Sequence, residues 1–168
     1  MNDRVNIDQM QRDALDHCIF PLAHTADVHR DGAHIYVEGR GLELIDQHGR
    51  VFLDMMGSHT RANSLGYGND EIARAVYAQL GRLHYVGTYD NFVAPAVTLA
   101  AKLAALTPGA LSQVMYVSGG SEAVEAALKL AKQYQVVSGR KPRAYKVIAR
   151  WNAYHGVTMG AHSVTDWL

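Results

Sequence analysis

The 168-residue sequence predicts an α/β protein, with a small N-terminal part followed by a larger part built on a mostly parallel sheet. Two observations support this fold class. Three short apolar segments separated by glycine turns predict a β meander near the N-terminus. From residue 69 onward apolar residues recur with the helical period of about 3.6, and helix-like segments alternate with strand-like ones. We place the two parts at residues 1–60 and 61–168.

The N-terminal part is expected to begin with a short helix over residues 8–18. Strands are predicted at residues 34–37, 42–46 and 51–54, because each segment is apolar and is bounded by glycine-rich turns. The small and polar residues of 57–68 then predict an irregular loop.

The second part is expected to alternate helices with strands. Asn69 suits a helix N-cap, two acidic residues follow it, and this helix should run to about Leu83. The remaining predicted elements are a helix after Pro95, strands at 114–117 and 145–149, and a helix over 122–134 with a Glu125–Lys129 pair.

Composition and charge exclude several classes of protein. The formal net charge of +0 argues against a broad basic surface for nucleic acid. No apolar run is long enough to cross a membrane, and the polar N-terminus lacks the apolar core of a secretory signal. The single cysteine, Cys18, cannot form an internal disulfide, which fits a cytoplasmic location. The nine histidines are scattered without metal-ligand spacing, so no metal site is expected.

The turn Ser118-Gly119-Gly120-Ser121 is the most informative local feature, because it lies between a predicted strand and a predicted helix. A helix N-terminus presents unpaired N–H groups, adjacent glycines let a ligand approach the backbone, and Ser121 adds a hydroxyl donor. These properties suit a phosphate. The alternative is a tight turn that only begins the helix. Neither a P-loop nor a dinucleotide fingerprint is present.

Tyr154 and His155 follow the second predicted strand. In an open α/β sheet ligands bind beyond the carboxyl ends of the strands, so this loop and the 118–121 turn could share one edge. A tyrosine there could stack on a flat heteroaromatic ring. The alternative is an aromatic side chain that only fills the loop.

Taken together, four segments resemble the class III (omega-type) aminotransferases of the pyridoxal-phosphate (PLP) fold type I superfamily. They are GLELIDQHGRVFLD, LGYGNDEIARAVYAQLGRLHY, VMYVSGGSEAVEAALKLAKQY and RWNAYHGVTMGAHS, in this order and with the family's spacing. The resemblance covers nearly the whole chain. It implies an incomplete fold type I structure: a small N-terminal α+β part and the first half of the large PLP-binding domain.

The resemblance also implies roles for particular residues. Gly119, Gly120 and Ser121 would hold the phosphate of PLP, although Gly119 stands where the family usually has a serine. Tyr154 would stack on the ring, and His155 would support its loop. Tyr89 matches a segment that reaches the partner subunit's active site, which makes it a substrate-pocket candidate.

The loop after the third strand departs from the family pattern. Members often have Gly-(Leu/Ile)-Trp there, whereas this chain has Gly-Ser-His-Thr-Arg at residues 57–61. Arg61 could bind a substrate carboxylate through paired hydrogen bonds, or it could be a solvated loop residue.

The family's Schiff-base lysine lies beyond Leu168. None of the five lysines (102, 129, 132, 141 and 146) has the expected context, so no catalytic residue is assigned within the chain.

The resemblance implies amino-group transfer from an amine or omega-amino acid to a keto acid such as pyruvate. It also implies a homodimer with active sites at the interface, with the missing half supplied by a longer product or by a second chain. Two alternatives stay open. One is another class III reaction, by an aminomutase, racemase or phospholyase; the other is a non-catalytic remnant or binding module.

Overall fold

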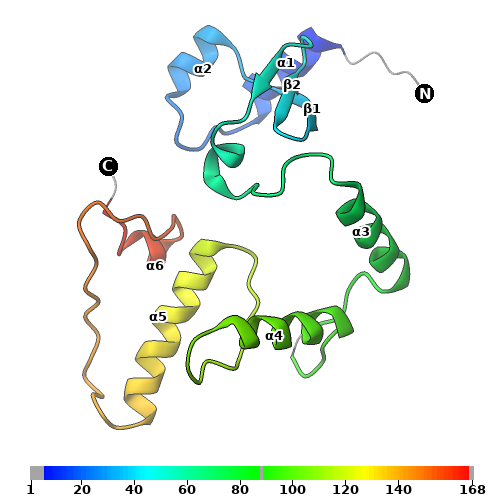
Figure 1. Cartoon of the computed structure of the whole chain (residues 1–168). Helices are drawn as coiled ribbons and strands as arrows, with labels where there is room; N and C mark the ends of the chain where they lie inside the picture. The colour runs from blue at the N-terminus through cyan, green and yellow to red at the C-terminus, as the bar shows by residue number, and fades with distance from the viewer. Residues whose placement is uncertain (1–5, 88, 167–168) are drawn as a thin grey trace. The chain divides into compact units, whose positions relative to one another are not determined.

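The computed structural model describes residues 6–87 and 89–166, and it divides the chain into two compact units, Met1–Val86 and Gly87–Leu168 (Figure 1). The unit boundary falls between helices α3 (Asp70–Arg82) and α4 (Ala94–Leu106). The predicted domain boundary at residues 60–61 concerns the complete fold of the family and stays a prediction.

Two helices open the first unit: α1 (Ile7–His17), as predicted, and α2 (Thr25–Asp31), which the sequence analysis missed. The side chain of Asn6 caps α1 by accepting the N–H of Gln9, whereas α2 has no side-chain cap to signal its start. Gln11 of α1 holds the chain after α2 through both of its amide atoms. Its nitrogen donates to the carbonyl of Ala33 at 2.7 Å, and its oxygen accepts the N–H of Ala33 at 3.0 Å.

An antiparallel three-stranded meander follows, in the order β1 (Tyr36–Arg40), β2 (Glu43–Asp46), β3 (Val51–Leu53). All three predicted strands are confirmed, with the first displaced by two or three residues towards the C-terminus. Leu44 pairs with Phe52, and the rings of Tyr36 and Phe52 meet edge to face with centroids 5.8 Å apart.

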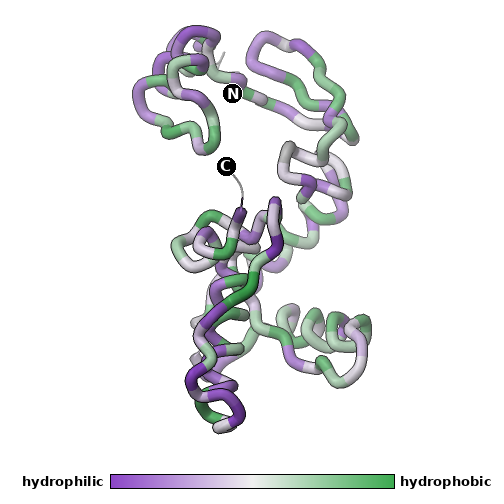
Figure 2. Tube along the Cα trace, turned by 90° about the vertical axis from the view of Figure 1, so that its left-hand side faces the viewer, coloured by the Kyte–Doolittle hydropathy of each residue, from purple (hydrophilic) through white to green (hydrophobic). Residues whose placement is uncertain are grey.

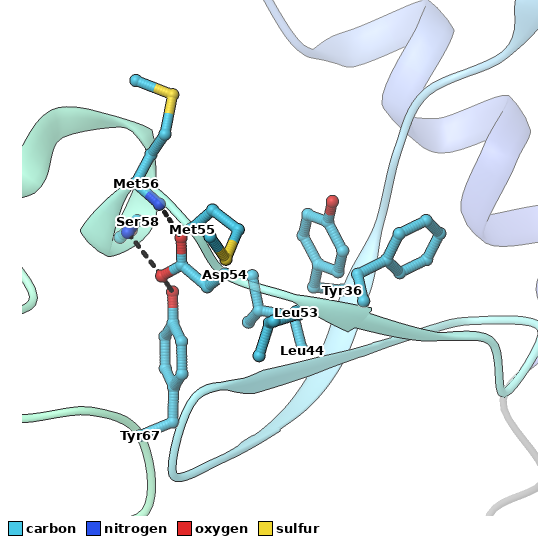
Figure 3. A pocket seen from close by; sticks show the side chains of 9 residues that line it. Tyr36, Leu44, Leu53, Asp54, Met55, Met56, Ser58 and Tyr67 are labelled. Atoms are coloured by element: carbon cyan, nitrogen blue, oxygen red, sulfur yellow. Dashed lines mark hydrogen bonds between the residues drawn. The ribbon is translucent and has the colours of Figure 1, made fainter.

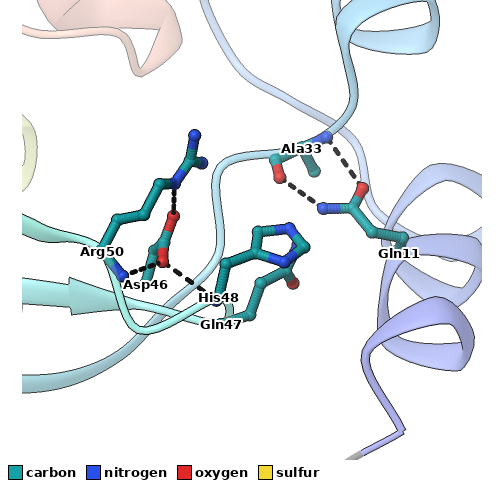
Figure 4. A network of polar contacts seen from close by, with 6 residues as sticks. All are labelled: Gln11, Ala33, Asp46, Gln47, His48 and Arg50. Carbon is teal, nitrogen blue, oxygen red and sulfur yellow. Dashed lines mark hydrogen bonds and ion pairs between the residues drawn. The ribbon is translucent and has the colours of Figure 1, made fainter.

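The turn between β2 and β3 is organised by Asp46, whose side chain is only 2% exposed (Figure 4). One carboxylate oxygen accepts the backbone N–H groups of His48 and Arg50, and the other accepts the Arg50 guanidinium at 2.6 Å. Burial opposes ionisation, but these hydrogen bonds outweigh it and hold the pKa of Asp46 below its ordinary value.

The segment after β3 is more ordered than the irregular loop expected from its composition. Gly57–Arg61 forms a single π-helical turn, in which the N–H of Ala62 bonds to the carbonyl of Gly57. The chain then returns to the meander, where Tyr67 exchanges two backbone hydrogen bonds with Gly41. Helix α3 follows, and Asn69 caps it as predicted by accepting the N–H of Ile72.

The second unit contains α4, α5 (Gly120–Val137) and the single turn α6 (Met159–His162). Both long helices were predicted. The predicted strands at 114–117 and 145–149 are not formed, since neither segment is paired with another within residues 89–166. Residue types indicate that a segment can form a strand, but the strand itself requires a neighbour to complete the hydrogen-bond ladder.

The described residues leave much apolar surface uncovered. Apolar and polar positions follow one another along the trace in Figure 2, yet the buried residues in the described part of the chain are Ala33, Asp46, Gly156 and Ala161. The accessible surface is 14670 Å². A compact folded monomer of this mass would expose about 8,200 Å². Ile148, in the second predicted strand, is 97% exposed, as expected for a segment without a sheet around it.

Candidate functional site

The N-terminus of α5 begins at the predicted phosphate-binding turn. The N-cap residue, Gly119, has an extended backbone, and being a glycine it has no side chain to cap the helix. Instead, the carboxylate of Glu122 turns back and accepts the N–H of Ser118 at 2.7 Å. Within residues 89–166 no protein acceptor meets the N–H groups of Gly120 and Ser121. The first turn of α5 therefore retains donors and the positive end of an 18-residue helix dipole.

The loop that carries Tyr154 and His155 is fixed by two residues near the end of the described chain. Asp166 accepts the N–H of Asn152 at 2.8 Å, and its own N–H donates to the carbonyl of Ala153. The hydroxyl of Thr165 accepts the N–H of His155 at 2.9 Å and lies 3.0 Å from the carbonyl oxygen of Gly156. These bonds hold the loop in one shape without a surrounding sheet.

This loop and the α5 turn are in direct contact, although they lie far apart in the sequence. The N–H of Val157 donates to the hydroxyl oxygen of Ser121 at 3.1 Å. Gly156 is buried against the same serine with φ +129°, and a Cβ built on it would come within 2.5 Å of the Ser121 oxygen. The juxtaposition expected from the sequence is therefore present. Within residues 89–166 the Ser121 hydroxyl donates to no protein acceptor, so its proton is available to a bound ligand.

The individual candidates differ in their exposure. The side chain of Tyr154 is 57% exposed, and His155 beside it is half-buried. Tyr89 lies between α3 and α4 and is fully exposed. Arg61 ends the π-helical turn of the first unit with φ 62°, and within the described chain its side chain forms no ion pair.

Three residues that support the site were not identified from the sequence. Two are Thr165 and Asp166, for which the sequence offers no local signal. The third is Glu125, which was expected to pair with Lys129. In the described structure it forms no ion pair within 4.0 Å and instead accepts the N–H of Gly160 at 2.8 Å. The nearby Thr158 hydroxyl and this N–H lower the pKa of Glu125, with a smaller effect from the charge of Lys129.

The first unit carries a separate open pocket of about 620 Å³ beside Asp54 (Figure 3). The carboxylate accepts the N–H groups of Ser58 at 2.6 Å and Met56 at 3.0 Å, and the hydroxyl of Tyr67 at 2.8 Å. These bonds lower the pKa of Asp54 and fix the start of the π-helical turn. The other lining residues are apolar or aromatic: Tyr36, Leu44, Phe52, Leu53, Met55 and Met56.

Comparison with known proteins identifies the family. The aminotransferase class-III family profile matches residues 25–167. The chain belongs to the class III aminotransferase family. It is 43% identical over 131 residues to a protein of Mycobacterium tuberculosis named as a probable aminotransferase, covering 78% of this chain and 28% of that protein. It is 34% identical over 149 residues to the diaminobutyrate–2-oxoglutarate transaminase of Halomonas elongata, covering 84% and 31%.

Solved structures agree with this assignment. An (S)-enantioselective omega-transaminase from Thermomicrobium roseum matches with a TM-score of 0.91 and 33% identity, over 96% of this class III chain and 36% of that one. A transaminase from Virgibacillus matches with a TM-score of 0.87 and 31% identity, over 94% and 36%. The predicted fold class is thus confirmed. The chain spans about a third of the length of the relatives it matches.

Class III aminotransferases depend on PLP, and the residues at α5 fit a phosphorylated cofactor. Gly119 and Gly120 have nothing within 4 Å of the position of a Cβ, so the backbone is open to an approaching group. The amides of Gly120 and Ser121 and the Ser121 hydroxyl supply donors without competing protein acceptors in residues 89–166. The negative charge of the nearby Glu122 carboxylate would repel an anion. Its hydrogen bond from the Ser118 N–H holds this carboxylate at the start of the turn.

Proposed function

We propose that this chain supplies the phosphate anchor and the ring-covering loop of a PLP-dependent aminotransferase. The observation that carries the proposal is the hydrogen bond from the Val157 N–H to Ser121. This bond brings the loop with Tyr154 to the helix N-terminus that has free donors, so an anion and an attached aromatic ring could both be held there.

Each residue would have a distinct task. The N–H groups of Gly120 and Ser121 and the Ser121 hydroxyl would donate to phosphate oxygens. Gly119 would allow close approach while contributing no hydroxyl. Tyr154 would cover the flat face of the ring, and His155 would hold the loop through its backbone bond to Thr165.

PLP supplies an electron sink for reaction at the carbon that bears the substrate's amino group. The chain's own contribution is binding and orientation. Tight binding of the phosphate would fix the distance and angle between the ring and the groups that move protons. No residue of this chain is assigned as one of those groups.

The proposed reaction moves an amino group from an amine or omega-amino acid to a keto acid, in a homodimer located in the cytoplasm. Relatives whose names state such reactions include the putrescine–pyruvate aminotransferase of Pseudomonas aeruginosa, 30% identical over 150 residues. Arg61 and Tyr89 are proposed to face the substrate; Arg61 suits a carboxylate because its guanidinium can form two parallel hydrogen bonds.

The substitution Ser121→Ala tests the phosphate anchor. It removes one charge-assisted donor and the acceptor for Val157, so PLP should bind about 1–2 kcal/mol more weakly, or roughly 5- to 30-fold. Equilibrium dialysis of PLP against the full-length protein measures the change. Ser138→Ala is the matched control, because this serine lies at the opposite end of α5. Equal PLP affinity in Ser121→Ala and the unsubstituted protein would refute the anchor.

The same dialysis separates the enzyme from a non-catalytic remnant. A full-length protein that retains no PLP with Ser121 intact would favour the remnant. Substrate assays on a protein that does retain PLP distinguish transamination from the reactions of an aminomutase, racemase or phospholyase.

A further inference from the structure

Helix α5 makes a second contact with the Tyr154 loop region, one helical turn beyond Ser121. Residues four apart on a helix lie on the same face, so Ser121 and Glu125 point in a common direction. The facing segment repeats this spacing with Gly156 and Gly160. The first contact joins Ser121 to the Val157 N–H at 3.1 Å, and the second joins Glu125 to the Gly160 N–H at 2.8 Å.

Both contacts require the facing backbone to come very close. A Cβ built on Gly160 would lie 2.8 Å from one carboxylate oxygen of Glu125 and 3.1 Å from the other. A Cβ on Gly156 would lie 2.5 Å from the Ser121 hydroxyl oxygen and 2.9 Å from the Cβ of Ala161. The two glycines therefore let the segment lie directly on α5, and Ala161 is fully buried at this junction.

We propose that Glu125 is a positioning residue for the cofactor site, acting through Gly160 to hold the Tyr154 loop against the N-terminus of α5. The proposal rests on the proposed function, because the loop's position matters to a ligand only if the ligand binds there.

The chemistry of Glu125 suits this task. An ionised carboxylate only accepts hydrogen bonds, and it accepts the Gly160 N–H more strongly than a neutral oxygen would. Glu125 is ionised near neutral pH, because its pKa lies below even the ordinary value of 4.5. With Glu125 removed, the Gly160 N–H would lose its acceptor at a half-buried position, and the hydrogen bond from Val157 to Ser121 would lose the support of this second contact with α5.

Hydrogen–deuterium exchange of the full-length protein without PLP tests the contact itself. Glu125→Ala should raise the exchange rate of the Val157 and Gly160 amides by about tenfold, because opening this contact loses one charge-assisted bond. Glu125→Gln retains an acceptor and should restore most of the protection. Gln133→Ala, on the exposed part of the same helix, is the control. Unchanged exchange in Glu125→Ala would overturn the proposal, whatever its affinity for PLP.

Equilibrium dialysis tests the consequence for the cofactor. PLP should bind about tenfold more weakly to Glu125→Ala, and near-normal binding should return in Glu125→Gln. If the unsubstituted protein retains no PLP, the proposed function fails while the exchange measurement still decides the contact. If Glu125→Ala exchanges faster yet binds PLP normally, the positioning role is refuted and the phosphate anchor is unaffected.

Discussion

Asp46 illustrates how one residue can organise a turn when little apolar burial is available. Its carboxylate is nearly inaccessible to solvent, yet it is ionised because two backbone N–H groups and the Arg50 guanidinium point at it. The same three donors fix the residues between β2 and β3, so the register of the hairpin is determined by polar bonds at its turn.

The charge of Asp46 makes the meander sensitive to acid. Its pKa is lower in the folded state than the ordinary value of 3.8, so its stabilising effect is complete above that value and is lost as the pH falls below it. Asp46→Asn should therefore lower the melting temperature at pH 7, and this difference should shrink progressively as the pH falls below 3.8. Scanning fluorimetry of both proteins across this range measures the difference. A difference in melting temperature that is the same at every pH would contradict it.

Among the elements, the π-helical turn shows how hydrogen bonds to a side chain can stabilise an irregular backbone. Gly57, Ser58 and Arg61 all adopt left-handed backbone angles, which cost free energy for the two residues that are not glycine. Asp54 offsets this cost by accepting two backbone N–H groups from the turn and the Tyr67 hydroxyl.

Removing the carboxylate should release the turn. In Asp54→Ala the amides of Met56 and Ser58 lose their acceptors, and their hydrogen–deuterium exchange should accelerate by roughly tenfold or more. Asp16→Ala, on exposed α1, provides the matched control. Unchanged protection of Ser58 in Asp54→Ala would show that the turn is held by other contacts.

At the scale of the whole molecule, large apolar side chains remain exposed. They are prominent in α4 and in the segments that were expected as strands, where Val97 is 55% exposed and Val147 is 53% exposed. No helix of the described residues is long and apolar enough to cross a membrane. Exposure of so many large apolar side chains is typical of segments that pack against further protein.

The isolated 168-residue chain should therefore bind a dye such as 8-anilino-1-naphthalenesulfonate strongly and associate as its concentration rises. Dye fluorescence and sedimentation velocity measure these effects. The full-length protein, if it covers these faces, should bind several-fold less dye for each copy of the chain. Equal dye binding by the two would indicate that the apolar faces are native surface.

Local signals in the sequence predicted much of this structure, and non-local contacts account for what they missed. Asn69 and the 3.6-residue spacing after it identified α3, because caps and periodicity depend on neighbouring residues. The two absent strands were misassigned because their pairing depends on other segments. The same reason explains why Glu125 was matched with nearby Lys129, when its partner Gly160 lies 35 residues away.

The region around Gly156 and Gly160 cannot easily change in length, because the spacing of these glycines matches that of Ser121 and Glu125. The close approaches of the two glycines depend on a fixed offset of four residues, and the hydrogen bonds donated by Val157 and Gly160 depend on an offset of three. Adding or deleting one residue between the glycines would therefore displace one contact whenever the other is kept. Many single replacements of residues 157–159 would preserve both offsets. Insertions and deletions should accordingly be far less tolerated there than in the loop at residues 139–142, where no such pairing exists among the described residues.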